Sequence, residues 1–185
     1  MWQQLLCLVL SSCSHTDTDV LRGREIHVTS FLSAPYLIRN PDAIDGYEGF
    51  MVDLLDALAD NLGCRFIIRE VADGRYGMKK EGSDGDSRKE EWTGMIGEVM
   101  RGEADLAVAD LTATAARSLV VDFTQPILDN QLVAVANRGL ATVTSLAELA
   151  ERDNVTFLVM AGGSTSKFFQ LTKDPVYRAV AEKMR

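Results

Sequence analysis

Residues 109–117, with the sequence ADLTATAAR, place two threonines and one arginine directly after an apolar run. The guanidinium of Arg117 is a planar donor that matches a carboxylate with two parallel hydrogen bonds, and Thr112 and Thr114 add hydroxyls beside it. The apolar run reads as a strand ending at Asp110, and the next residues can begin a helix, whose first N–H groups attract an anion. Ligands of open α/β sheets lie at the carboxyl ends of strands. The stretch therefore predicts a small-carboxylate site, with the alternative that Thr112 only caps a helix and Arg117 is solvated.

A second stretch, residues 160–169 (MAGGSTSKFF), repeats this form: an apolar run, two glycines, and Ser164 and Thr165 at a helix start. The backbone N–H groups of Ser164 and Thr165 would point at an anion, unless Ser164 only caps the helix. A phosphate loop is excluded because the G-x-x-x-x-G-K-[ST] spacing is absent. Two anion-binding turns on either side of a lobe boundary suggest one ligand with two acidic groups.

A third stretch, residues 71–77 (VADGRYG), carries Tyr76 after a glycine turn, where its ring could cover a bound molecule or pack beneath its own loop. The sequence has no G-x-S-x-G and no H-E-x-x-H, and His27 alternates with apolar residues in a strand. We therefore expect no catalytic residues. Three cysteines without a C-x-x-C pair and two distant histidines also predict no metal site and no cofactor.

Elements of two kinds alternate along the chain and must position these residues. Short apolar runs indicate strands, and apolar residues at helical spacing indicate helices. The alternation predicts an α/β fold with a parallel sheet, and residues 72–91 read as a long exposed loop. The predicted strands are 26–31, 64–71, 104–110, 120–126, 131–137 and 155–160. The predicted helices are 49–63, 92–102, 145–153 (capped by Ser145), 164–172 and 174–185.

Composition and charge restrict the partners. The chain has 185 residues, 46% of them hydrophobic, and a net charge of −8, which argues against nucleic acid because phosphate binding needs a concentrated basic face. No stretch approaches the roughly 20 apolar residues that cross a bilayer. The apolar run 5–10 resembles a weak secretion signal with cleavage near Ser14, although its positive flank is missing. A sequon at Asn154 is consistent with secretion.

Together these motifs resemble the ligand-binding domain of ionotropic glutamate receptors, of the AMPA and kainate type. The resemblance covers residues 24–185 and rests mainly on the block WTGMIGEVMRGEADLAVADLTATAARSLVVDFTQP. It implies a two-lobed, periplasmic-binding-protein-like clamshell that closes on an amino acid, with L-glutamate as the expected ligand. It also implies a plasma-membrane receptor with an extracellular binding face and partner receptor subunits.

By position, the resemblance implies that Arg117 clamps the ligand α-carboxylate and that Thr112 helps hold the α-carboxylate and the α-amino group. Asp110 contributes a backbone carbonyl to the amine, Tyr76 covers the ligand, and the helix start receives the side-chain acid at Ser164 and Thr165. Two positions depart from the family pattern. Asp110 stands where proline is usual, so its carboxylate could itself pair with the amine. Ser33 stands where an acidic residue often bridges the lobes.

The resemblance also predicts a division into a leader (1–23), a first lobe (24–135) and an incomplete second lobe (136–185). The family's membrane spans are absent between the halves, so we expect a fragment without a pore that binds glutamate weakly or not at all in isolation. Micromolar affinity by calorimetry would overturn that expectation. Two alternatives stay open: a soluble solute-binding protein, which shares the clamshell, and an enzyme built on the same fold, for which only Asp110 offers an acid.

Overall fold

The computed structural model describes residues 4–6, 8–10, 21–80, 91–130, 145–159 and 163–185. The chain divides into two compact units, Met1–Gln131 and Leu132–Arg185, and each is considered by itself.

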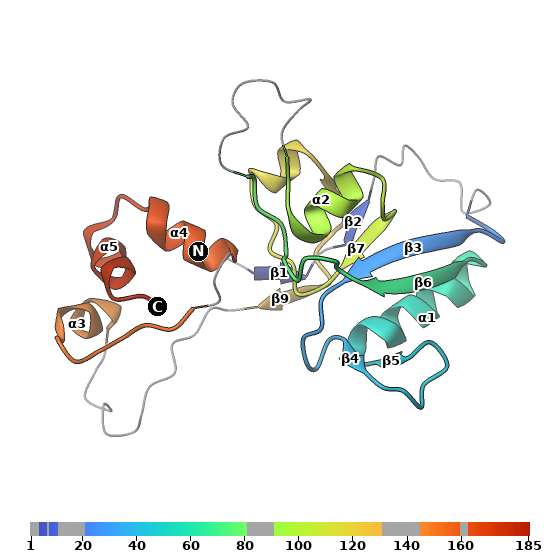
Figure 1. The fold of residues 1–185 in the computed structure, drawn as a ribbon, viewed down its shortest axis with the longest axis horizontal. Coiled ribbons are helices and arrows are strands. Elements are labelled where there is room, and N and C mark those ends of the chain that lie inside the picture. The colour runs from blue at the N-terminus through green and yellow to red at the C-terminus, as the bar shows by residue number, and fades with distance from the viewer. Residues whose placement is uncertain (1–3, 7, 11–20, 81–90, 131–144, 160–162) are drawn as a thin grey trace. The chain divides into compact units, whose positions relative to one another are not determined.

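A five-stranded sheet forms the centre of the first unit (Figure 1), in the order β6-β3-β7-β2-β8. Its parallel part consists of β3 (Glu25–Ser30), β6 (Arg65–Glu70) and β7 (Leu106–Val108). Antiparallel to it run β2 (Leu8–Leu10) and, beyond that, β8 (Asp122–Phe123). Two small antiparallel pairs complete the unit: β1 (Gln4–Leu6) with β9 (Leu128–Asn130), and β4 (Ile38–Arg39) with β5 (Tyr47–Glu48). The predicted α/β class with a parallel sheet is confirmed.

Alternating side chains of β7 fill both faces of this sheet. Leu106 and Val108 pack in one buried cluster with residues of α1 (Phe50–Leu62). Ala107 packs in a second cluster with residues of α2 (Gly94–Met100). A strand buried on both faces reads as a continuous apolar run, which is why β7 could be predicted from sequence.

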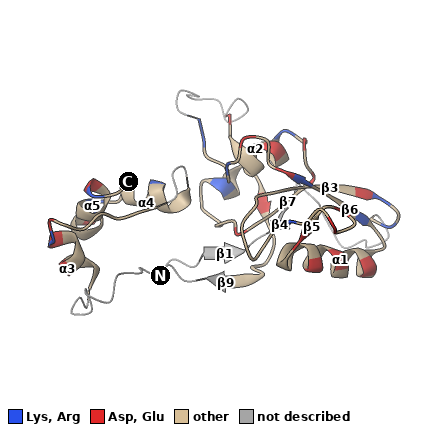
Figure 2. Ribbon diagram, turned by 60° about the horizontal axis from the view of Figure 1, so that its bottom comes forward, with Lys and Arg blue, Asp and Glu red and all other residues tan. Residues whose placement is uncertain are grey.

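Helix α1 ends as its sequence predicts. Gly63 adopts the left-handed conformation (φ 66°), and its N–H bonds to the carbonyl of Ala59. The outer face of the helix carries acidic side chains (Figure 2), which keep this surface solvated.

The described residues of the second unit form three helices: α3 (Leu146–Glu151), α4 (Ser164–Leu171) and α5 (Pro175–Glu182). Ser145 caps α3 by accepting a hydrogen bond from the N–H of Glu148, as predicted. An edge-to-face aromatic cluster of Phe168, Phe169 and Tyr177 joins α4 to α5.

Several sequence expectations change in the structure. The strand predicted over 155–160 is wrong for its described residues, where a single parallel bridge joins Phe157 to Met184. The side chain of Leu158 is largely exposed, so this apolar run does not pack as a strand of a sheet. The strand predicted over 131–137 lies outside the described residues. The apolar run 5–10 contributes to the backbone of β1 and β2, while its role as a secretion leader stays a prediction.

No helix among the residues that the structure describes is both long and apolar enough to span a bilayer.

Candidate functional site

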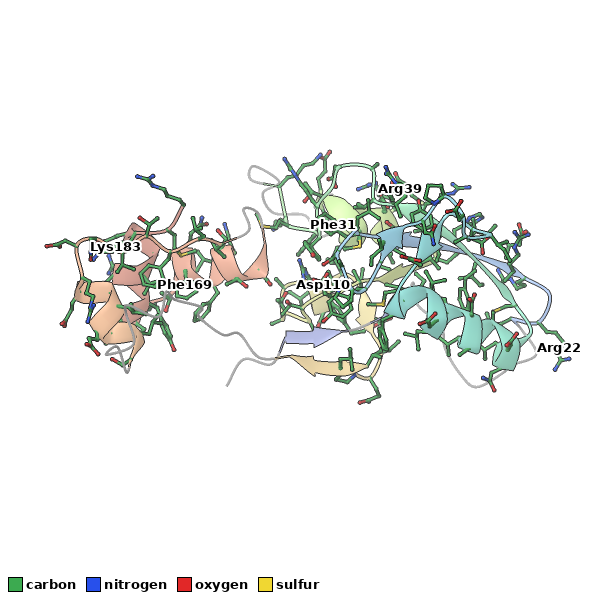
Figure 3. The ribbon with its side chains drawn as sticks, turned by 90° about the horizontal axis from the view of Figure 1, so that it is seen from below. Arg22, Phe31, Arg39, Asp110, Phe169 and Lys183 are labelled. Atoms are coloured by element: carbon green, nitrogen blue, oxygen red, sulfur yellow. The ribbon has the colours of Figure 1, made fainter. Side chains whose placement is uncertain are left out.

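The topology of the first unit points to one place for a ligand: the edge of the sheet that is formed by the carboxyl ends of its parallel strands. From β3 the chain passes through α1 to β6 on one side, and from β6 it passes through α2 to β7 on the other side of β3. The strand order therefore reverses between β3 and β7, and ligands of open α/β sheets bind outside the carboxyl ends of strands at such a point. Phe31 follows β3 and Asp110 follows β7 (Figure 3), so both lie at this edge.

Arg117 is the most buried charged side chain of this edge, with 3% of its surface exposed. Its Nε and Nη2 both donate to the carbonyl of Gly77, at 3.2 and 2.9 Å. Its Nη1 donates to the carbonyl of Thr112 at 2.7 Å. The alternative prediction of a solvated Arg117 is therefore wrong, and the guanidinium joins the Gly77 loop to the segment after β7.

The charge of Arg117 has no acidic partner among the residues that the structure describes. A guanidinium carries five N–H groups, and the three bonds to carbonyl oxygens leave one hydrogen on each terminal nitrogen uncommitted within those residues. Burial without a counter-charge disfavours the charged form and lowers the pKa of Arg117 to about 10. A buried cation of this kind is stabilised by an anion that reaches it.

Tyr76 and Asp110 form a second polar group at the same edge. The hydroxyl of Tyr76 donates to Oδ1 of Asp110 at 2.8 Å, and the hydroxyl of Ser33 donates to Oδ2 at a longer 3.4 Å. The Tyr76 ring packs on Phe31 with a centroid separation of 4.7 Å. Burial, followed by the charge of Asp110, raises the pKa of the Tyr76 hydroxyl above its ordinary value. Tyr76 thus stays a neutral donor at physiological pH.

The start of α2 fixes the backbone of Tyr76. The N–H groups of Met95 and Ile96 bond to the carbonyls of Arg75 and Tyr76. This contact requires glycine at position 94, where a Cβ would lie 2.2 Å from the Arg75 carbonyl oxygen and φ is +64°. The predicted loop is exposed at residues 72–75, as expected, but it is buried or half-buried at residues 76–78, while residues 81–90 lie outside the described residues.

The segment after β7 departs from the predicted helix start. Residues 111–114 have no helical structure, and only a 3₁₀ turn, Arg117–Leu119, follows. The hydroxyl of Thr114 accepts the N–H of Arg117 at 3.3 Å, so it initiates that turn, and Thr112 is not an N-cap. The prediction that a helix N-terminus after Asp110 binds an anion is thus wrong, because Thr114 bonds locally to the backbone instead.

Ser164 and Thr165 are the first residues of α4, whose N-cap is Gly163, so the predicted helix start is confirmed. Both side chains are half-buried. Ser164 is not the N-cap that was predicted, since it is the first residue of the helix and Gly163 holds the N-cap position. These two residues belong to the second unit, whereas Tyr76, Asp110, Thr112 and Arg117 converge in the first.

The carbonyl of Gly77 is the site feature that sequence reasoning missed. A signal existed: Gly77 sits in the same short glycine turn as Tyr76, has φ +130°, and would place a Cβ 2.5 Å from the Ile96 side chain. Within the described part of the chain, no group of three or more His, Cys, Asp or Glu residues could hold a metal ion.

Comparison with known proteins shows what this chain is similar to. Residues 24–138 match the model of the family "Ligated ion channel L-glutamate- and glycine-binding site". Glutamate receptor U1 of Xenopus laevis is 43% identical over 122 residues, which are 66% of this chain and 23% of that protein. The "Probable glutamate receptor" of Anas platyrhynchos is 45% identical over 118 residues, covering 60% of this chain and 22% of the relative. "Glutamate receptor ionotropic, kainate 5" of Mus musculus is 40% identical over 116 residues, covering 60% of this chain and 11% of the relative.

Proposed function

Because the chain belongs to the family of L-glutamate- and glycine-binding regions of ligated ion channels, the ionotropic glutamate receptors, we propose that its first unit carries the part of an amino-acid site that recognises the α-carboxylate and the α-ammonium group. The chain spans less than a quarter of each relative described above. The proposal is therefore limited to recognition of the ligand. In this proposal the natural ligand of the chain is L-glutamate.

The observation that carries the proposal is the buried guanidinium of Arg117, which has no acidic partner within the described residues. Removing a charge from water costs several kcal/mol, and a counter-charge with good geometry offsets that cost. The uncommitted N–H groups on the two terminal nitrogens of Arg117 suit the two oxygens of one carboxylate. The carbonyls of Gly77 and Thr112 hold the guanidinium in place without neutralising it.

Asp110 supplies the opposite charge for the ligand's ammonium group. Its two carboxylate oxygens accept hydroxyl hydrogen bonds from Tyr76 and Ser33 and form no ion pair within the described residues. A cation from the ligand would complete this group. The Tyr76–Gly77 turn contacts both the Asp110 carboxylate and the Arg117 guanidinium, and this pair of opposite charges favours a zwitterionic α-amino acid over a simple acid or amine. Thr112 assists at the α-carboxylate, and the Tyr76 ring covers the ligand.

The start of α4 receives the ligand's second carboxylate in this proposal. Ser164 and Thr165 open an eight-residue helix whose first N–H groups favour an anion. Two lobes closing around one dicarboxylic amino acid would form a clamshell, and closure would favour one state of a receptor channel through its higher affinity for ligand. Other receptor subunits are the expected partners, and the extracellular face of the plasma membrane is the expected location.

The test is ligand-detected NMR with the purified 185-residue chain and three ligands: L-glutamate, glutarate, which lacks the amine, and butylamine, which lacks both carboxylates. The first-unit contacts alone support an affinity of about 1 mM for L-glutamate, or about 4 kcal/mol. Glutarate should bind more weakly and butylamine should not bind. Arg117→Lys should abolish L-glutamate binding. Arg65→Lys is the matched control, because Arg65 is exposed and begins β6 at the opposite edge of the sheet.

Asp110→Asn and Asp110→Pro separate the amine contact from the carboxylate contact. Loss of a charged hydrogen bond worth about 1.5–3 kcal/mol should reduce the preference for L-glutamate over glutarate tenfold or more. Unchanged or tighter L-glutamate binding by Asp110→Pro would refute the role of the Asp110 carboxylate. Equal binding of all three ligands, or binding that survives Arg117→Lys, would refute the proposal as a whole.

A further inference from the structure

We propose that Asn154, in the second unit, is a site of N-linked glycosylation. Asn154-Val155-Thr156 is the single Asn-x-Ser/Thr triplet with a middle residue other than proline in the 185-residue sequence. The acceptor asparagine must reach the glycosyl-transferring enzyme, and the finished glycan must remain in solvent. The described residues around the triplet meet both conditions.

The triplet alternates its side chains between solvent and the interior. Asn154 lies in the turn after α3 and is exposed, Val155 is half-buried, and Thr156 is exposed. The acceptor asparagine and the threonine two residues after it are therefore both accessible from solvent. Neither the Asn154 carboxamide nor the Thr156 hydroxyl makes a hydrogen bond within the described part of the chain. A sugar on Asn154 would consequently break no contact of the fold.

The segment is anchored on both sides of the triplet. Before it, Nζ of Lys183 donates to the carbonyls of Ala150 and Arg152, at 2.6 and 2.8 Å, and so holds the end of α3. After it, the backbone of Phe157 pairs with Lys183 and Arg185. Lys183, labelled in Figure 3, thus takes part in both anchors, through its side chain before the triplet and through its backbone after it. The exposed triplet is a short bridge between fixed points, so its exposure is a property of the fold.

The chemistry requires a lipid-linked oligosaccharide pyrophosphate as the donor. Nδ2 of Asn154 forms a bond to the anomeric carbon of the first sugar, and the bond from that carbon to the pyrophosphate oxygen breaks. The lipid pyrophosphate leaves with the electron pair, and the amide nitrogen loses one proton. No atom changes its oxidation state in this transfer. The inference rests on entry of this region into the lumen of the secretory pathway, as expected for an extracellular receptor region, and is independent of ligand recognition by Arg117.

The test expresses the full chain behind a cleavable signal sequence in cultured cells and scores only the lumenal, protease-protected product. Its gel mobility should fall in one step, and peptide N-glycosidase should restore it and leave aspartate at position 154 in a peptide mass map. Asn154→Gln and Thr156→Ala should lose the shift, whereas Thr156→Ser should keep it. Asn61→Gln is the matched control, because Asn61 is exposed and lies outside any sequon.

Three results would overturn the proposal. The first is lumenal wild-type chain without a glycan, and the second is a glycan that persists in Asn154→Gln. The third concerns the folded state: the glycosidase should act on the native protein without denaturant, because the Asn154 turn is exposed. Release of the glycan only after denaturation would contradict the geometry on which the site rests.

Discussion

The guanidinium of Arg117 donates hydrogen bonds from two N–H groups to the carbonyl oxygen of Gly77, although the two residues are 40 positions apart in sequence. This contact joins the turn that carries Tyr76 to the segment that follows β7. The same arginine that is proposed to bind the ligand therefore also holds the ring that is proposed to cover it. Ligand recognition and local stability depend on one side chain.

Substituting Arg117 should consequently lower stability as well as binding. Arg117→Lys retains the charge but cannot reproduce the fork to Gly77 and Thr112, so the free energy of unfolding of the first unit should fall by about 2–4 kcal/mol. Urea unfolding measures the change. Arg65→Lys, at an exposed ion pair, should change it by less than about 1 kcal/mol. Equal values for the two variants would show that the Gly77 contact contributes nothing.

The Tyr76 hydroxyl should contribute about 1 kcal/mol through its bond to Asp110. Tyr76→Phe removes that bond and keeps the ring stacked on Phe31, so thermal or urea unfolding should show this modest loss. Tyr177→Phe is the matched control, because the Tyr177 ring packs between phenylalanines and its hydroxyl makes no hydrogen bond within the described residues. If Tyr76→Phe leaves the free energy of unfolding unchanged, the Tyr76 hydroxyl bonds equally well to water.

Position 94 should tolerate no residue other than glycine, because the atom that a side chain would meet belongs to the backbone. Gly94→Ala brings a methyl group to 2.2 Å from the Arg75 carbonyl oxygen in addition to the strain of positive φ. Gly102→Ala carries the same kind of strain, about 1–2 kcal/mol, with nothing within 4 Å of the new methyl group. The first variant should be clearly the less stable in urea unfolding and should weaken ligand binding by displacing Tyr76. Similar losses in both would assign the whole effect to backbone strain.

Binding of a carboxylate should depend on pH through Arg117. Burial lowers its pKa in the ligand-free protein to about 10, and a bound carboxylate would raise that pKa again. Binding is therefore at full strength below the ligand-free pKa and falls as the pH rises above about 10. Glutarate is the right probe because it has no amine of its own to titrate. An affinity that already declines between neutral pH and pH 9 would implicate another group.

Local signals in the sequence predicted most of the elements correctly. Gly63 ends α1 and Ser145 caps α3 because each supplies a conformation or an acceptor within a few residues. The predictions failed where distant partners decide the outcome. The strand over 155–160 had no sheet to join, and the helix after Asp110 gave way to a turn in which Thr114 bonds to Arg117.

For the site, residue types were predictable and contacts were not. Arg117, Thr112, Asp110 and Tyr76 followed from motif and resemblance, and all four lie in the first unit. The hold of Arg117 on the Gly77 carbonyl depends on backbone geometry, which side-chain chemistry does not encode. Likewise, the reversal of strand order between β3 and β7 follows from strand pairing and cannot be read from the order of elements.

The most direct test of the account is the Nε–Hε resonance of Arg117 in the ¹⁵N-labelled full chain, assigned by its absence in Arg117→Lys, during titration with L-glutamate. A carboxylate that engages the guanidinium should shift this resonance progressively and saturably, with a midpoint near 1 mM, or about 4 kcal/mol. The Nε–Hε resonance of Arg65 should stay in place. An Arg117 resonance that does not move while the ligand binds, or that moves no more than that of Arg65, would contradict the claim.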